Sequence, residues 1–257
     1  MKSLEKESGL KVALLKEGLS YDQKEFEVFA APRLFSETES VYLDKTAPDK
    51  ELYYMYRYFE KQGDKKIFER ADSEYDITVI KSGLVGKEYI KTKGHYHSLV
   101  PGTEISYPEV YEVITGEIDY LIQTRPNEKR ETEVVIIKAT VGDKIVVPPG
   151  YGHVSINVGN ETAVSSNLQK RDLPAGADYG GFEYFHGGAM YRTVDGWIDN
   201  PEYVITSVRY VKPKEKPSWG LKKEKTLYES FIKNPERFDF IIHPQNHNFS
   251  DVWTNLE

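Results

Sequence analysis

The stretch GDKIVVPPGYGHVSIN, residues 142–157, contains the most regular pattern in the chain. Its glycine, proline, histidine and asparagine residues follow the spacing G-x5-P-x-G-x2-H-x3-N, from Gly142 to Asn157. Gly142-Asp143 is expected to turn the chain into a strand. Pro148-Pro149-Gly150 is expected to bend the chain out of that strand, because glycine tolerates a positive φ. The bend would return His153 across the interior of a β-structure.

The sequence around this stretch consists of short segments rich in β-branched and aromatic residues, bounded by Gly, Pro, Asn or Asp. These segments are residues 52–59, 75–80, 109–114, 118–122, 133–137 and 144–147. Many short strands at regular spacing favour a sandwich or a barrel, so we expect an all-β fold. Thr115-Gly116-Glu117, between two of the segments, predicts a hairpin turn.

Changes in residue composition along the sequence divide the chain into three parts. Residues 1–50 are mixed and charged and are expected to form an N-terminal wrapping segment. Residues 51–180 carry the predicted barrel. Residues 181–257 are expected to form a C-terminal extension packed on the barrel. The extension should contain a strand at 204–211 and a short helix at 225–232, where apolar residues recur at helical spacing.

Composition limits the classes of protein to which the chain can belong. The 257 residues include no cysteine, so the chain has neither disulfides nor thiolate metal ligands. The N-terminus lacks the apolar region of a signal peptide, and no stretch approaches the roughly 18 apolar residues of a membrane span. A net charge of −7 argues against a nucleic-acid partner. We therefore expect a cytoplasmic protein without a membrane partner, and a local pocket could still bind a small anion.

A second pattern, Gly94-His95-Tyr96-His97, supplies candidate metal ligands. On a strand, residues two apart point to the same face, so His95 and His97 would aim both imidazoles at one point. Glu109 and His153 follow downstream. Three imidazoles and one carboxylate suit a divalent first-row metal such as Fe, Mn, Zn or Ni, and they leave positions open for substrate.

Taken together, the two patterns resemble the motifs of the cupin family. The first motif pairs the His-x-His with a glutamate and a glycine, and Glu109 precedes Gly116 by the expected spacing. Glu104 lies at the distance from His97 that is usual in the family. We nevertheless choose Glu109, because it begins an uninterrupted predicted strand with the motif Glu-Val-Tyr. Glu104 instead precedes Pro108 in a loop, where a ligand is harder to hold still.

Within the cupins, residues 52–180 resemble the cupin-type glucose-6-phosphate isomerases known mainly from archaea. The most specific segments are residues 78–97, 109–111, 148–159 and 175–180. The resemblance implies a jelly-roll β-barrel that usually forms a homodimer and equilibrates glucose 6-phosphate with fructose 6-phosphate. It also implies one divalent metal per chain and a phosphorylated hexose as the binding partner.

The resemblance carries site residues over to matching positions of this chain. The metal ligands would be His95, His97, Glu109 and His153. The residues that contact the substrate phosphate would be Tyr53, Thr78, Thr92, Gly94 and Tyr179. Glu109 and Tyr111 would be catalytic, and both would point inward from one strand face. The hydrogen would move between C1 and C2 either as a proton through a carboxylate or as a hydride that needs no base.

Three differences from the family concern the substrate more than the metal. The interval from His97 to Glu109 contains the additional loop Val100–Thr103, Ala177 replaces a histidine usual in the family, and a tyrosine usual before His153 is displaced. The four ligands alone would also serve a cupin dioxygenase, a decarboxylase or a non-catalytic sugar-binding cupin. The threonine and tyrosine phosphate set favours the isomerase.

Overall fold

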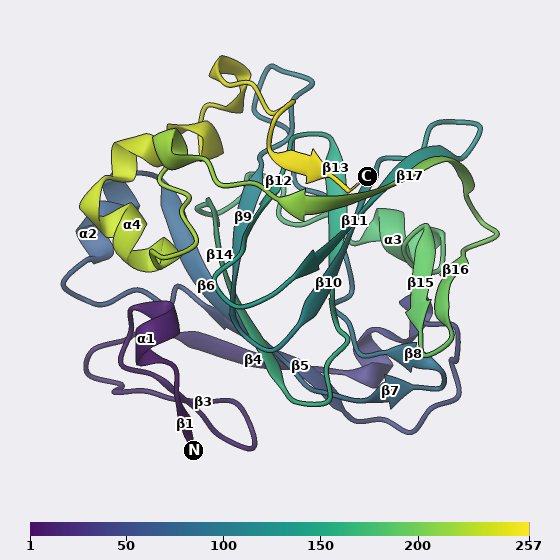
Figure 1. The fold of residues 1–257 in the computed structure, drawn as a ribbon, viewed down its shortest axis with the longest axis horizontal. Coiled ribbons are helices and arrows are strands. Elements are labelled where there is room, and N and C mark those ends of the chain that lie inside the picture. Colours follow the sequence, from purple (N-terminus) through teal and green to yellow (C-terminus); the bar gives the residue numbers. More distant parts are fainter. Residues whose placement is uncertain (257) are drawn as a thin grey trace.

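Two β-sheets face each other and enclose the centre of the molecule (Figure 1). The structure, a computed structural model, describes residues 1–256. The first sheet has the order β12-β9-β14-β6-β5-β4, and the second has the order β13-β10-β11-β17-β18. The strands of the first sheet are β4 Phe29–Leu34, β5 Glu51–Arg57, β6 Ser73–Ile80, β9 Glu109–Thr115, β12 Lys144–Val147 and β14 Ala163–Lys170. Those of the second are β10 Ile118–Thr124, β11 Glu131–Ala139, β13 Tyr151–Asn157, β17 Val204–Pro213 and β18 Trp253–Asn255.

Smaller elements surround this pair of sheets. One small sheet contains β1 Lys2–Ser3, β2 Ala13–Leu14 and β3 Leu19–Ser20, and another contains β7 Leu84–Val85, β8 Glu88–Tyr89, β15 Met190–Thr193 and β16 Gly196–Asp199. The α-helices are α1 Glu5–Ser8, α2 Lys65–Arg70, α3 Gly180–Tyr184 and α4 Leu227–Lys233. Short 3-10 helices cover Phe35–Glu37, Glu39–Val41, Pro217–Trp219, Pro235–Ile241 and Pro244–Asn246. Among the described helices, none has the length and apolar character needed to cross a bilayer.

The mostly β architecture confirms the expected cupin-type jelly roll, and each of the six predicted strand segments overlaps a strand. The predicted helix is confirmed as α4, whose N-terminal Thr226 side chain accepts a hydrogen bond from the Glu229 N–H at 3.2 Å. Strands from both ends of the chain join the main sheets, since β4 pairs with β5 and β17 pairs with β11. The division at residues 50 and 180 stays a prediction.

The predicted hairpin at residues 115–117 is wrong. β9 pairs with β12 and β14, whereas β10 pairs with β11 and β13, so the turn carries the chain from one sheet to the other. Gly116 has a φ of 85°, and a Cβ there would lie 2.9 Å from the Ala163 Cα. Glycine is therefore needed for the close crossing as well as for the backbone angle. Pro148-Pro149-Gly150 makes a second crossing, from β12 to β13.

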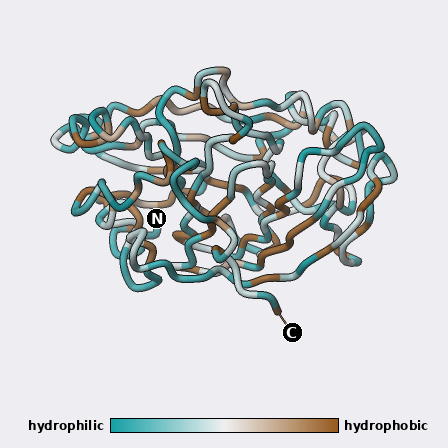
Figure 2. Tube along the Cα trace, turned by 90° about the horizontal axis from the view of Figure 1, so that it is seen from above, coloured by the Kyte–Doolittle hydropathy of each residue, from teal (hydrophilic) through white to brown (hydrophobic). Residues whose placement is uncertain are grey.

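The first sheet separates two hydrophobic cores. Alternate residues of β6 and β9 point to opposite faces, as the strand period requires. Tyr111 and Val113 pack between the two main sheets, whereas Val110 and Ile114 pack on the outer face with Phe231 of α4 and its aromatic neighbours. Figure 2 shows hydrophobic stretches running through the middle of the molecule, with hydrophilic loops around the rim. The C-terminal segment, from α4 to the 3-10 helix Pro235–Ile241, thus covers the outer face of the first sheet.

A buried ion pair fastens this C-terminal segment to the sheet. Glu112 of β9 and Lys144 of β12 lie 2.7 Å apart, and both side chains are almost fully buried. The other Glu112 oxygen accepts a hydrogen bond from the Leu227 N–H of α4 at 2.7 Å. Lys144 also donates to the carbonyl of Lys225. Burial raises the pKa of Glu112 to about 7, while Lys144 acts to lower it.

We expect Glu112→Ala to destabilise the fold by about 3–5 kcal/mol, because it leaves the Lys144 ammonium buried without its partner. Urea unfolding followed by circular dichroism measures the loss. The control is Glu202→Ala, which removes an equally short but exposed pair with Arg130 and should cost no more than about 1 kcal/mol. Equal losses in the two variants would show that the buried pair does not hold the C-terminal segment.

Candidate active site

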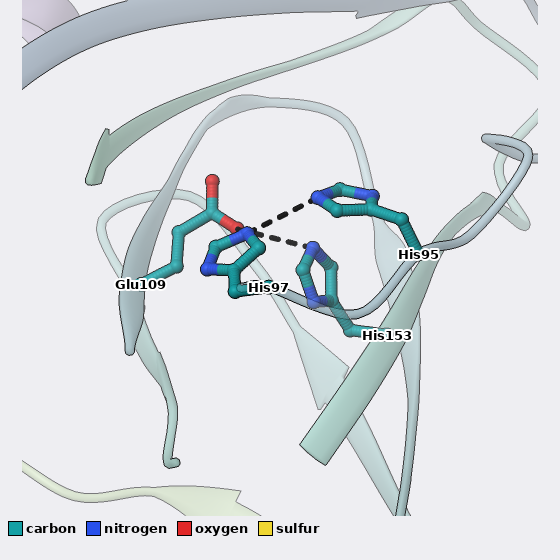
Figure 3. A group of neighbouring side chains, drawn as sticks. All are labelled: His95, His97, Glu109 and His153. Atoms are coloured by element: carbon teal, nitrogen blue, oxygen red, sulfur yellow. Dashed lines mark hydrogen bonds and ion pairs between the residues drawn. The ribbon is translucent and has the colours of Figure 1, made fainter. Parts of the chain in front are cut away.

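Three imidazoles and one carboxylate converge between the two main sheets (Figure 3). The Nε2 atoms of His95 and His97 are 3.1 Å apart. One carboxylate oxygen of Glu109, Oε2, lies 3.3 Å from His97 Nε2 and 3.1 Å from His153 Nε2. The other oxygen points away from the imidazoles. His97, Glu109 and His153 are each at most 5% exposed, so water has little access to these atoms.

The backbone fixes each of these four side chains. Glu109 begins β9, and His153 lies near the start of β13, directly after the second crossing between the sheets. His95 and His97 were expected on a strand, but they lie in an extended segment outside the named strands. A single β-bridge joins His95 to His153, with backbone N–H···O distances of 3.3 and 3.1 Å. The segment that carries His95 and His97 is thereby hydrogen-bonded directly to the strand that carries His153.

The pKa shifts of His95, His153 and Glu109 favour the protonation states that bind a metal cation. Burial lowers the pKa of His95 and of His153, and neighbouring imidazoles lower each further. Burial alone would raise the pKa of Glu109, but His153 and His97 outweigh it and hold that pKa well below its usual range. His97 Nδ1 lies 3.0 Å from the Tyr107 carbonyl, which can accept only from Nδ1–H and so orients Nε2 toward the other three side chains. Neutral imidazoles and an ionised carboxylate are the forms that ligate metals.

The spacing of the four atoms also fits a metal. Ligand atoms about 2.1 Å from a common ion in octahedral geometry lie about 3 Å from one another. The His95–His97, His97–Glu109 and His153–Glu109 separations are 3.1 to 3.3 Å, and all four ligand atoms lie within 4.8 Å of one another. Glu109 Oε2 is buried and makes no well-aligned hydrogen bond within the described chain, despite its short distances to the imidazoles. A divalent first-row ion would satisfy that oxygen and the facing lone pairs together.

The residues predicted to contact phosphate line a cavity of about 300 Å³ beside this group. The cavity lining includes His95, Glu109 and Tyr111 from the predicted centre. It also includes the whole predicted phosphate set: Tyr53, Thr78, Thr92, Gly94 and Tyr179. Tyr111 bonds through its hydroxyl to His153 Nε2 at 2.8 Å. The predicted phosphate residues therefore share one cavity with His95, Glu109 and Tyr111, whereas His97 and His153 do not line it.

Local contacts leave a hydroxyl donor free among the residues predicted to contact phosphate. The Thr92 hydroxyl accepts from the Ser155 N–H at 3.0 Å, so its own hydrogen is available to a ligand. Gly94 has a φ of 81°, and a Cβ there would lie 2.8 Å from Phe182 and Val154 side-chain atoms. Lys93 also lines the cavity, but its ammonium pairs with Glu183 at 2.5 Å. Gly94 thus allows the backbone to pass close to Phe182 and Val154 while Thr92 faces the cavity.

Glu104 and the additional loop lie on the other side of the centre. Glu104 is exposed and lines a second cavity with His97 and Leu99. Ala177, which replaces the family's histidine, lies in the segment between the two cavities and lines both of them. Glu104 is not part of the four-residue group.

Sequence reasoning missed a set of charged and amide side chains that line the same cavity: Arg57, Glu74, Asp76, Asn167 and Gln169. A signal for some of them was present. Arg57 is four residues after Tyr53, and Asp76 is two residues before Thr78, so each shares a strand face with a predicted site residue. Charged residues at inward positions of apolar strands are candidates for function.

Comparison with known proteins identifies the family. A family model described as glucose-6-phosphate isomerase (GPI) matches residues 28–206. The chain belongs to the glucose-6-phosphate isomerase family. The matched residues include all four members of the convergent group and all five of the predicted phosphate set.

Several relatives carry the name glucose-6-phosphate isomerase. The protein from Thermococcus litoralis is 33% identical over 129 residues, which are 47% of this chain and 62% of the relative. The protein from Thermococcus kodakarensis is 30% identical over 177 residues, covering 66% of this chain and 86% of the relative. A solved structure of Lactobacillus farciminis oxalate decarboxylase aligns with 48% of this chain and 30% of its own, at 19% identity and a TM-score of 0.33. That similarity is too low to support an inference.

We expect Glu109→Gln to weaken metal binding strongly, because it replaces an anionic donor in a group of otherwise neutral imidazoles. Loss of an outer-shell partner costs about 10–100-fold in metal affinity, so loss of the carboxylate charge itself should cost at least as much. Competition with a chromogenic chelator measures the affinity. Glu104→Gln is the matched control and should bind metal as the parent protein does. The reverse result, with metal lost only in Glu104→Gln, would mean that the wrong glutamate is assigned.

Proposed function

We propose that this protein interconverts glucose 6-phosphate and fructose 6-phosphate, with one divalent metal held by His95, His97, Glu109 and His153. The observation that carries the proposal is one cavity lined by the predicted phosphate residues and by two members of the convergent group, His95 and Glu109, with His97 and His153 directly behind them. A dioxygenase or a decarboxylase needs the metal ligands but has no use for a phosphate set. The metal would be Fe, Mn, Zn or Ni. The homodimeric state and the cytoplasmic location are part of the same proposal.

The substrate would lie along the cavity between two anchors. Tyr53, Thr78, Thr92, Gly94 and Tyr179 would hold the phosphate with hydroxyl and backbone donors. Because burial raises the pKa of Tyr53, its hydroxyl stays protonated and can donate. The other end of the open-chain sugar would place C1 and C2 beside Glu109 and Tyr111. Holding both ends aligns the reacting carbons with the groups that act on them.

A bound divalent ion supplies Lewis-acid stabilisation to the oxygens at C1 and C2. One hydrogen must also move between C1 and C2, and the role of Glu109 in that transfer differs between two routes. In the proton route, Glu109 takes a proton from C2 of the aldose and returns it to C1, using the oxygen that points away from the imidazoles. The proton of the C2 hydroxyl passes to the C1 oxygen, so that the carbonyl moves from C1 to C2. In the hydride route the hydrogen passes directly between the carbons and Glu109 serves as a ligand only. In both routes Tyr111, whose pKa is raised by burial, remains a hydrogen-bond donor.

Removal of the metal should abolish isomerisation. A coupled assay of fructose 6-phosphate conversion is run on the untreated protein, after chelation and dialysis, and after addition of Mn²⁺ or Fe²⁺. Activity should disappear on chelation and return with a divalent ion. Undiminished turnover by protein shown to be metal-free would contradict the proposal, and so would the absence of turnover in fully metal-loaded protein.

Thr92→Val should raise the KM for fructose 6-phosphate while leaving the metal content unchanged. The lost hydroxyl would otherwise donate to a charged phosphate, and such a bond contributes about 1.5–3 kcal/mol, or at least tenfold in affinity. Steady-state kinetics and elemental analysis of the same preparation test both parts. An unchanged KM, or equally efficient turnover of unphosphorylated fructose by the parent protein, would refute the phosphate assignment.

A further inference from the structure

The inner face of the first sheet carries a polar row that neither the motifs nor the phosphate set explain. The strand register places Asp76 of β6 opposite Asn167 of β14, and Asn167 opposite Tyr111 of β9. All three residues line the cavity. At the end of the row, the Tyr111 hydroxyl lies 2.8 Å from His153 Nε2, beside the four-residue group. Thr78 lies two residues after Asp76 on β6, and Glu109 lies two residues before Tyr111 on β9, each on the same strand face as its neighbour in the row. The row therefore lies between a predicted phosphate residue and a predicted metal ligand.

The two Asp76 oxygens have unequal partners. Oδ1 accepts from the Tyr58 N–H at 2.8 Å. Oδ2 is held only by long contacts, 3.3 Å from Arg57 Nη1 and 3.4 Å from Gln169 Nε2. Asp76 is 4% exposed and Asn167 is 5% exposed. Buried polar atoms usually have close partners, so a carboxylate oxygen with two long contacts on a cavity wall has capacity for a further donor.

Burial and the neighbouring Glu74 raise the pKa of Asp76 to about 8, so these two carboxyls retain a proton near neutral pH. Together with one guanidinium they then carry little net charge, which favours a neutral donor over a cation. The Arg57 guanidinium lies 3.3 Å from Asp76 and 3.7 Å from Glu74, so one cation already faces both carboxylates. Gln169 donates to the same pair, at 2.8 Å to Glu74. The carboxamide of Asn167 adds a donor and an acceptor to the wall. Hydroxyl groups, which donate and accept, match such a mixed surface.

We propose that Asp76 and Asn167 bind the hydroxyls on C3 to C5 of the sugar chain and make the site selective for polyhydroxylated phosphosugars. This inference rests on the proposed function, because it uses the metal and phosphate ends as the two anchors of the chain. Arg57 acts as a positioning residue that holds the Asp76 carboxylate against the cavity.

Binding of an unreactive open-chain analogue tests the inference without requiring turnover. The probes are sorbitol 6-phosphate, its 3-deoxy, 4-deoxy and 5-deoxy analogues, and inorganic phosphate, each titrated calorimetrically into metal-loaded protein. The parent protein should prefer sorbitol 6-phosphate to at least one deoxy analogue by about tenfold or more, the loss typical of a hydrogen bond to a charged group. Asp76→Ala should reduce that preference to less than about threefold, with inorganic phosphate affinity unchanged.

Glu60→Gln is the matched control. Glu60 is another buried carboxylate that pairs with an arginine, Arg171 at 2.8 Å, but it does not line this cavity. It should keep the full preference. If Asp76→Ala does not fold, Asp76→Asn and Asn167→Ala replace it and should show the same loss.

Two results would overturn the inference: a parent protein that binds all analogues equally, or a folded Asp76 variant that keeps the preference. A parent protein that shows the predicted binding pattern yet does not isomerise fructose 6-phosphate would refute the proposed function alone.

Discussion

Nitrogen atoms of three imidazoles and one carboxylate oxygen face a common point in this protein, and three of these four side chains are buried. Atoms of this kind repel one another unless protons or a cation lie between them, and burial strengthens the repulsion because little water screens it. Burial keeps His95 and His153 neutral by lowering their pKa, so protonation of the imidazoles is a costly solution. A divalent ion removes the repulsion and satisfies all four donors at once. The sheets around the group hold it in this otherwise unfavourable arrangement.

The fold maintains that arrangement through two crossings between its sheets. The chain passes from β9 to β10 at Gly116 and from β12 to β13 at Pro148-Pro149-Gly150. These crossings put Glu109 on one sheet and His153 on the other, so the ligand group spans the interior. The outer face of the first sheet is covered by α4 and its aromatic neighbours. The Glu112–Lys144 pair links that covering to the same two strands, β9 and β12, that lead into the crossings.

The sequence predicted the parts of the site that short motifs specify. The spacing of His95 and His97 indicated a shared face, and the resemblance of the two motifs to the cupin family added Glu109 and His153. The choice of Glu109 over Glu104 also followed from local chemistry, since Glu109 begins a strand and Glu104 lies before a proline. The turn at Gly116 was mistaken for a hairpin because a crossing between sheets and a hairpin can use the same short glycine-containing sequence. Arg57 and Asp76 could have been found from the strand period, which places them on the same face as Tyr53 and Thr78. Asn167 could not, because only the register of β6, β14 and β9, a long-range property, places it beside Asp76 and Tyr111.

The most direct measurement of the central claim is an anomalous difference map from crystals of the metal-loaded protein, collected at the absorption edge of the bound metal. The account predicts one strong peak per chain, about 2.0–2.3 Å from the Nε2 atoms of His95, His97 and His153 and from a carboxylate oxygen of Glu109. A map without a peak among these four side chains, in protein that contains stoichiometric metal, would contradict it.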